Sequence, residues 1–313
     1  MRTRAIGTLE VSEVGVGCNN FGARLDENAV RAVVDTAIEA GITLFDTADI
    51  YGGTRSELLL GRALGSRRDQ VVLATKFGMP IDEQRSGASP NYVRRALDDS
   101  LKRLGTDHID LYQLHVPDDA TPIADTLAVL GDLVRAGKVR EIGCSNFTAE
   151  QLREAEEAAG TGMPHFVSVQ NQYSILYREP EQAVLPECDR LGLAFLPYYP
   201  LASGLLSGKY RAGSAPPAGT RMATYPADRT NTWLTEHNLS TVAALTKYAE
   251  SRGHSVLELS IGWLLSRSTV ASVIAGAMTP EQVRANAAAA SWDLVDADLI
   301  AVDHIAPVDT TGR

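Results

Sequence analysis

The stretch Phe45-Asp46-Thr47-Ala48-Asp49-Ile50-Tyr51-Gly52 decides the fold, because it joins a short apolar strand to a loop that carries an acid and a tyrosine. The residues before the acid, 42–45, are typical of a buried strand, and Ser56 and Glu57 suit the first turn of a following helix. In an α/β barrel, the chemistry lies on loops that follow the strands. The stretch therefore indicates an active site, with the alternative that Asp46 only caps the helix.

A strand followed by a helix recurs along the chain without a break in composition. Apolar strands are predicted at residues 14–17, 42–45, 71–76, 109–115, 139–145, 166–170, 193–199 and 273–274. Amphipathic helices separate these strands, and several of them end at a glycine. Alternation of this kind is typical of an α/β barrel or of a doubly wound sheet.

Eight strand–helix units favour an α/β fold of the (β/α)8 TIM-barrel type. An N-terminal β-hairpin is expected over residues 4–13, and extra helices are expected at the C-terminus. Gly15 and Gly17 match part of the G-x-G-x-x-G dinucleotide-binding turn, but Asn20 occupies the third glycine position, so we reject that match. We expect a single domain over residues 1–313.

Local signals predict several helix starts and one long loop. The predicted starts are Ser89-Pro90, a capping box of Thr148 with Gln151, and a capping box of Thr279 with Gln282 that opens a last helix ending near Ala290. The segment 206–230 is rich in Gly and Pro and follows the seventh strand. Because long loops inside compact domains are usually functional, we predict a lid or binding loop there rather than a linker.

The composition excludes several classes of partner. The 313 residues are 44% hydrophobic and 22% charged, with a formal net charge of −10. Nucleic acid and anionic membranes both attract clustered Lys and Arg, so we expect neither as a partner. The segment 1–5 lacks the apolar run of a signal peptide, and no stretch approaches the roughly 18 apolar residues of a membrane helix. A cytoplasmic location is therefore predicted.

The three cysteines, Cys18, Cys144 and Cys188, are too few and too scattered for a disulfide framework or a zinc site. Cys18 and Cys144 each lie at the end of a predicted strand. We interpret them as small core residues, and we expect no metal.

Four polar side chains follow consecutive predicted strands. Asp46 and Tyr51 follow the second, Lys76 ends the third and His115 ends the fourth, so a barrel would bring them to one rim. A neighbouring ammonium lowers the pKa of a phenol from about 10, and an aspartate positions that lysine. With a neutral histidine to orient the substrate oxygen, the set predicts proton donation to a carbonyl. The alternatives are a structural Lys–Asp salt bridge and a core histidine.

Several motifs together carry a resemblance to a known family. They are 46–52 with Ser56-Glu57, Ala74-Thr75-Lys76-Phe77-Gly78, Asp110-Leu111-Tyr112-Gln113-Leu114-His115 and Gly143-Cys144-Ser145-Asn146-Phe147. Over essentially its whole length the chain resembles the aldo-keto reductase superfamily, in particular its bacterial-type NADP-dependent members. The resemblance implies NADPH-dependent reduction of a small-molecule aldehyde or ketone, with Tyr51 as general acid assisted by Lys76, Asp46 and His115.

The resemblance also implies a cofactor site. Its expected residues are Cys18, Asn19, Asp46, Ser145, Asn146, Gln170, Tyr198, Pro200, Leu201, Ala202, Gly204, Leu205, Lys209, Gly276, Thr279, Gln282 and Asn286. Within this set, Ser145, Asn146 and Gln170 would hydrogen-bond the nicotinamide carboxamide. Tyr198 would stack on the nicotinamide ring, and Lys209 belongs to the segment along the pyrophosphate.

At the adenosine end the chain departs from many relatives. Gly276, Ala277 and Gln282 stand where cationic or hydroxyl side chains commonly hold the 2′-phosphate of NADP. NADP is therefore the expected cofactor with a modest preference, and NAD is a possible one.

Two rival functions are compatible with parts of the pattern. One is a cofactor-binding regulatory subunit with little turnover, as in the channel-associated branch of the superfamily. The other is a non-redox barrel enzyme, such as an aldolase that uses Lys76 as a Schiff-base amine.

Overall fold

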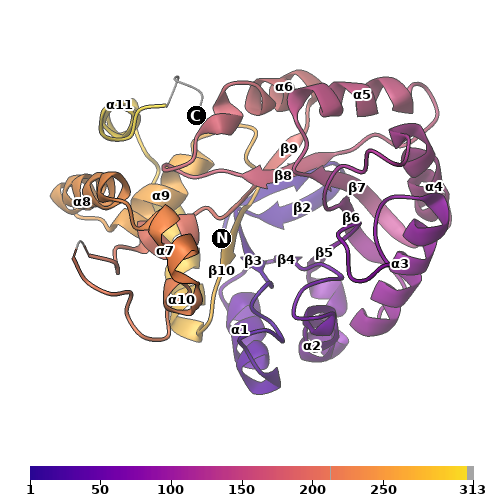
Figure 1. Cartoon of the computed structure of the whole chain (residues 1–313), viewed down its shortest axis with the longest axis horizontal. Coiled ribbons are helices and arrows are strands. Elements are labelled where there is room, and N and C mark those ends of the chain that lie inside the picture. Colours follow the sequence, from indigo (N-terminus) through magenta and orange to yellow (C-terminus); the bar gives the residue numbers. More distant parts are fainter. Residues whose placement is uncertain (212, 309–313) are drawn as a thin grey trace.

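A ring of eight parallel strands forms the centre of the computed structural model (Figure 1), which describes residues 1–211 and 213–308. In sheet order the strands are β10 (Val273–Gly276), β3 (Val14–Gly17), β4 (Leu44–Asp46), β5 (Val72–Phe77), β6 (Ile109–Leu114), β7 (Val139–Ser145), β8 (Ser168–Gln172) and β9 (Ala194–Tyr198). The segment before β10 completes the ring, because the Phe195 amide donates to Thr269 O (2.7 Å) and the Ala271 amide donates to Phe195 O (3.1 Å). The predicted (β/α)8 barrel is confirmed.

Helices surround these strands (Figure 1). Those between strands β3 and β9 are α1 (Glu27–Glu39), α2 (Arg55–Leu64), α3 (Pro90–Leu104), α4 (Ile123–Arg135), α5 (Ala149–Ala159) and α6 (Val184–Leu191). Those after β9 are α7 (Ala227–Trp233), α8 (Glu236–Ser251), α9 (Val256–Leu265), α10 (Pro280–Ala288) and α11 (Asp296–Ile305). Most of the longer helices bury an apolar face; in α1 that face includes Val30, Val33 and Ala37, which follow the helical period.

Short 3₁₀ segments complete the described elements: η1 (Gly65–Gln70), η2 (Glu179–Glu181), η3 (Ala202–Ser207), η4 (Met222–Thr224) and η5 (Ala289–Ser291). The predicted loop 206–230 is therefore partly helical, whereas the helix predicted near 233–251 is confirmed as α8, which begins three residues later than expected. Ala212 in that loop and residues 309–313 of the predicted domain lie outside the described residues.

The helix predicted as the last one is followed by another, α11. Val295 and Ile300 in this region are 54% and 57% exposed, so its apolar residues do not all face the core. A helix is recognised in a sequence by apolar residues at helical spacing. Because apolar residues of this region also lie on the exposed side, that spacing is weak here and does not predict α11.

The capping predictions have mixed outcomes. The box of Thr148 with Gln151 is confirmed at α5. Pro90 opens α3 as predicted, but Ser89 makes no side-chain cap bond. The box at α10 is wrong: Thr279 accepts from the Gln282 amide, whereas the Gln282 side chain accepts from the Met278 amide at 2.8 Å instead of from Thr279.

The predicted N-terminal hairpin, β1 (Thr3–Ile6) with β2 (Leu9–Ser12), closes the amino-terminal end of the barrel. Ile6, Leu9 and Val11 are at most 2% exposed and form one apolar cluster with inward residues of the barrel strands, among them Leu44 and Leu111. Apolar side chains therefore fill this end of the barrel. A functional site is expected at the opposite end, on the loops that follow the carboxyl ends of the strands.

We expect Leu9→Ala to lower the free energy of unfolding by about 2–5 kcal/mol, because it opens a cavity in this apolar plug. The site at the other end of the barrel should keep its activity at temperatures where the variant is folded. Urea denaturation measures the change. Glu10→Ala is the matched control, because the Glu10 side chain is exposed and accepts a hydrogen bond from the exposed Thr3 hydroxyl. An equal loss in both variants would contradict the prediction.

Candidate active site

A buried ion pair lies at the carboxyl end of the barrel. Asp46 ends β4, and Lys76 is the penultimate residue of β5. Lys76 Nζ lies 2.7 Å from Oδ1 and 2.6 Å from Oδ2 of Asp46, and it donates to Thr47 O at 2.9 Å. Lys76 is 0% exposed and Asp46 is 3% exposed. The carboxylate is thus committed to Lys76, and the residue at the N-cap of α2 is Thr54 rather than Asp46.

Tyr51 and His115 adjoin this pair. Lys76 Nζ is 5.3 Å from the centre of the Tyr51 ring, and the rings of Tyr51 and His115 meet edge to face with centroids 5.7 Å apart. The four side chains singled out in the sequence therefore come together, as the strand-end argument predicts.

The expected electrostatic effect of Lys76 on Tyr51 is wrong. Burial, followed by the Asp46 carboxylate, raises the pKa of the Tyr51 phenol well above its usual value. The physical reason is that the buried phenol would lose its hydration on ionising and would then face the Asp46 carboxylate, and these two effects dominate at Tyr51. Tyr51 is therefore held as the protonated phenol.

His115 is held neutral. Burial, followed by the nearby Lys76 ammonium, lowers the pKa of His115 to about 3. Its Nδ1 has no hydrogen-bond partner among the described residues. A neutral imidazole facing the cavity suits hydrogen bonding to a polar ligand, not proton transfer near neutral pH.

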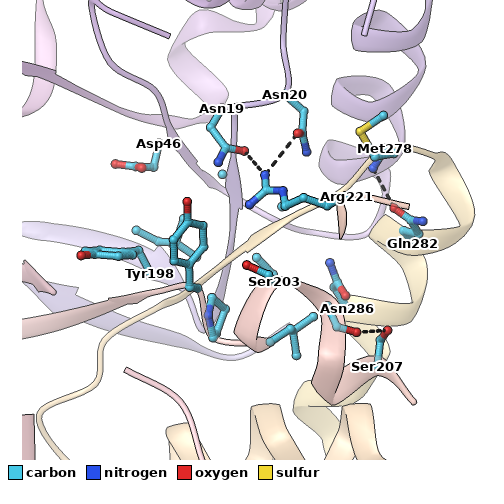
Figure 2. A pocket seen from close by; sticks show the side chains of 18 of the residues that line it. Asn19, Asn20, Asp46, Tyr198, Ser203, Ser207, Arg221, Met278, Gln282 and Asn286 are labelled. Carbon is cyan, nitrogen blue, oxygen red and sulfur yellow. Dashed lines mark hydrogen bonds between the residues drawn. The ribbon is translucent and has the colours of Figure 1, made fainter. Parts of the chain in front are cut away.

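A cavity of about 820 Å³ opens above these residues. Three of the four, Asp46, Tyr51 and His115, line it, and Lys76 lies beneath them. Figure 2 shows Asp46 and Tyr198 at one end and Met278, Gln282 and Asn286 at the other. The remaining expected cofactor residues on the lining are Asn19, Ser145, Asn146, Gln170, Pro200, Leu201, Gly204, Lys209 and Gly276.

Four expected cofactor residues are not part of the lining: Cys18, Ala202, Leu205 and Thr279. Cys18 and Ala202 are 0% exposed and Leu205 is 1% exposed, so these side chains belong to the core beneath the cavity. Thr279 accepts from the Gln282 amide as the N-cap of α10.

The expected carboxamide-binding residues already bond to one another. Ser145 Oγ donates to Gln170 O (2.7 Å), and Asn146 Nδ2 donates to His115 O (2.9 Å) and Ser145 Oγ (3.0 Å). Tyr198 OH donates to Asn146 Oδ1 at 2.8 Å. Asn146 has a φ of 62°, a left-handed conformation that asparagine tolerates better than most residues. The network fixes these polar groups around one end of the cavity.

Sequence reasoning missed an arginine that enters the cavity. Arg221 Nη2 donates to Asn19 Oδ1 (2.9 Å) and to Asn20 Oδ1 (3.2 Å), and the guanidinium lies over the Tyr199 ring at 5.6 Å (Figure 2). It belongs to the predicted lid segment 206–230, and that glycine- and proline-rich composition was the only signal for it. Part of this segment thus lines the cavity, and its role as a lid or binding loop stays a prediction.

Two further cations line the same space. Lys209 is exposed at the rim of the cavity, but partial desolvation of its ammonium, followed by Arg221 and Arg24, lowers its pKa. Arg24 donates to Gly219 O at 3.1 Å, which ties the loop after β3 to the lid segment. Three positive side chains thus concentrate positive charge around one cavity of an acidic protein.

The comparison with known proteins agrees with this geometry. Residues 13–307 match the Aldo/keto reductase family, and the chain belongs to that family. It is therefore an oxidoreductase of the kind that reduces carbonyl compounds with a nicotinamide cofactor. Within the described ranges, no helix is both long and apolar enough to cross a membrane.

Several relatives are similar over most of their length. The uncharacterized oxidoreductase YrpG of Bacillus subtilis is 36% identical over 88% of this chain and 86% of its own, and the aldo-keto reductase YhdN of the same organism is 34% identical over 93% and 88%. The NADH-specific methylglyoxal reductase of Escherichia coli is 33% identical over 95% of this chain and 96% of its own.

A second buried acid lies on the loop that carries Tyr51. Asp49 is 1% exposed, and its carboxylate oxygens have no hydrogen-bond partner among the described residues. Burial, followed by the Glu57 carboxylate, raises the pKa of Asp49 to about 7, against the opposing effect of Arg103. Asp49 therefore binds a proton more tightly in the folded chain than in the unfolded one.

We expect Asp49→Asn to become increasingly more stable than the wild type as the pH rises from about 4 to about 7. Below its unfolded pKa, Asp49 is protonated in both states, whereas above it only the unfolded chain ionises readily, which destabilises the fold. The difference in the free energy of unfolding between the two proteins should reach at most about 4 kcal/mol, because the pKa of Asp49 differs by about three units between the folded and the unfolded chain. Thermal unfolding of both proteins across this pH range measures it.

Asp118→Asn is the control, because the shift there has the opposite sign. Although partial burial opposes it, hydrogen bonds from the Ala88 amide and the Thr121 hydroxyl lower the pKa of Asp118. This variant should lose stability relative to wild type at neutral pH and less at low pH. A gap for Asp49→Asn that does not change with pH would contradict the prediction.

Proposed function

We propose that this chain is a single-domain, cytoplasmic NAD(P)H-dependent reductase that converts a small aldehyde or ketone to its alcohol, with Tyr51 as the proton donor. One observation carries the proposal: a fully buried Lys76–Asp46 pair lies beneath a phenol at the end of an 820 Å³ cavity. A cavity of this size suits a ligand as large as a dinucleotide.

The residues present fit a nicotinamide cofactor. The cavity is long, has polar amide groups and Tyr198 at the end near Asp46, and has Lys209, Arg221 and Arg24 on its lining. Ser145, Asn146 and Gln170 would hold the carboxamide, and the cations would hold phosphate groups. When bound, the reduced nicotinamide supplies a hydride to the carbonyl carbon.

The chain itself supplies the proton. As the carbonyl carbon accepts a hydride, the electron pair of the C=O bond moves to oxygen, and this oxygen takes the proton of the Tyr51 hydroxyl. A phenol whose pKa is raised stays protonated until such a strong base forms beside it. Neutral His115, 5.7 Å from Tyr51 between ring centres, is placed to hydrogen-bond the same oxygen.

The rival in which Lys76 forms a Schiff base has little support. Lys76 is 0% exposed, and its ammonium makes bonds to both oxygens of Asp46 and to Thr47 O. An amine nucleophile has to lose its proton and reach the substrate, and this pairing opposes both. No observation in the site favours the regulatory-subunit alternative over an enzyme.

We expect dual cofactor use with no more than a modest preference for NADPH, because the adenosine end is a weak site for the 2′-phosphate. Gln282, at the position where relatives often carry a cation, is occupied with the Met278 amide, and Glu281 adds a negative charge to the first turn of α10. Both features weaken this helix end as a site for a 2′-phosphate. Arg221 lies between the two ends of the cavity in Figure 2, where it would serve a pyrophosphate common to both cofactors.

Tyr51→Phe should lower kcat for aldehyde reduction at least about 100-fold, because it removes the proposed proton donor and little else. Cofactor affinity should be unchanged. Steady-state kinetics with benzaldehyde and methylglyoxal, together with cofactor titration by fluorescence, measure both quantities. Tyr199→Phe, a neighbouring tyrosine of the cavity lining, is the matched control. Near-normal turnover by Tyr51→Phe would refute the mechanism.

The kcat/KM measured with NADPH should exceed that measured with NADH by about tenfold. A helix N-terminus stabilises an anion by at most about 2 kcal/mol, which limits the preference to this range. Gln282→Arg should widen the preference, because it adds a cation where none stands. Arg221→Met should lower the affinity for NADPH and the affinity for NADH by the same factor. A preference above about a thousandfold, or a loss confined to NADPH in Arg221→Met, would show that a cation of the lid binds the 2′-phosphate.

A further inference from the structure

One buried amide beside the ion pair has no part in the reaction as described so far. Gln113, on β6, is 0% exposed, and its Nε2 donates to Asp46 Oδ1 at 3.1 Å. Gln170 Nε2 donates to the same oxygen at 3.0 Å and to Gln113 Oε1 at 3.4 Å. Oδ1 of Asp46 thus accepts from two amides and from Lys76, whereas Oδ2 accepts from Lys76.

The barrel is built to admit this side chain. Gln113 is in register with Lys76 on one neighbouring strand and with Gly143 on the other. A Cβ atom at Gly143 would lie 2.5 Å from Ser168 Oγ and 3.3 Å from Gln113 Cγ, so the glycine leaves room for Ser168 and for the aliphatic part of the Gln113 side chain. A buried amide is unfavourable unless it is hydrogen-bonded, and the Gln113 amide bonds to two side chains of the site, those of Asp46 and Gln170.

We propose that Gln113 is a positioning residue for proton transfer: its hydrogen bond to Asp46 Oδ1, shared with Gln170, holds the Asp46–Lys76 pair under Tyr51 and joins that pair to the cofactor end of the cavity. This inference rests on the proposed function. Gln170 lines the cavity while its Nε2 donates to Asp46, so one side chain touches both regions.

The hydrogen bond also sets the charge that Tyr51 experiences. An N–H donated to a carboxylate partly neutralises it, and Asp46 is the charged group that most raises the pKa of Tyr51. Loss of the Gln113 amide leaves more negative charge on Asp46. The phenol then ionises at higher pH, which is detectable in alcohol oxidation, where Tyr51 has to act as the base.

Gln113→Met tests this, because methionine has nearly the same length and lacks the amide. With benzyl alcohol and NADP⁺, we expect the pH midpoint of kcat to rise by about half a unit or more. In benzaldehyde reduction we expect kcat to fall about tenfold, with KM for the cofactor within twofold. Tyr112→Phe is the control: it changes the preceding residue of β6, whose hydroxyl has no partner among the described residues, and it should leave the pH midpoint unchanged.

A Gln113→Met enzyme with the wild-type pH midpoint would overturn the inference, even if its kcat or stability were lower, because a purely structural role does not move the midpoint. If Gln113→Met does not fold, Gln113→Leu replaces it, and failure of both to fold would assign Gln113 a structural role instead. Tyr51→Phe is measured in parallel. If Tyr51→Phe is active, the proposed function fails; if it is inactive and Gln113→Met keeps the wild-type midpoint, only the role of Gln113 fails.

Discussion

The ion pair of Lys76 and Asp46 is the interaction on which the rest of the site depends. Moving two opposite charges out of water is costly, by several kcal/mol for each ion, and their attraction offsets this only when the geometry is good and further hydrogen bonds complete it. Here Nζ reaches both carboxylate oxygens, and Thr47 O, Gln113 and Gln170 supply additional bonds. The residues of this network come from four strands, β4, β5, β6 and β8, so the ion pair persists only while these strands keep their positions relative to one another.

This requirement explains the division of the barrel into two layers. At the amino-terminal end, the hairpin residues Ile6, Leu9 and Val11 seal an apolar interior. At the carboxyl end, polar residues of the inner layer bond to one another and face the cavity. A buried charge pair is stable only where such hydrogen-bond partners surround it. The pair could therefore not lie at the amino-terminal end, which is filled by apolar side chains.

The lid segment connects the far parts of the chain around the cavity. Arg221 bonds to Asn19 and Asn20, and Arg24 bonds to Gly219, so the loop after β3 and the segment after β9 hold each other in place. The arginines thereby bring positive charge into a protein with a net charge of −10. Local charge and overall charge are independent quantities, and the ligand experiences the local one.

The sequence alone determined the barrel, the hairpin and the four residues Asp46, Tyr51, Lys76 and His115, because apolar periodicity and strand ends are local features that any parallel barrel converts into one rim. Only the tertiary structure decided the burial, the pKa shifts and the long-range contacts of those residues. Burial and the Asp46 carboxylate raise the pKa of Tyr51, and Arg221 reaches Asn19 across 202 positions of the chain. Such contacts and charges depend on burial and distance in the folded chain, which no local pattern encodes.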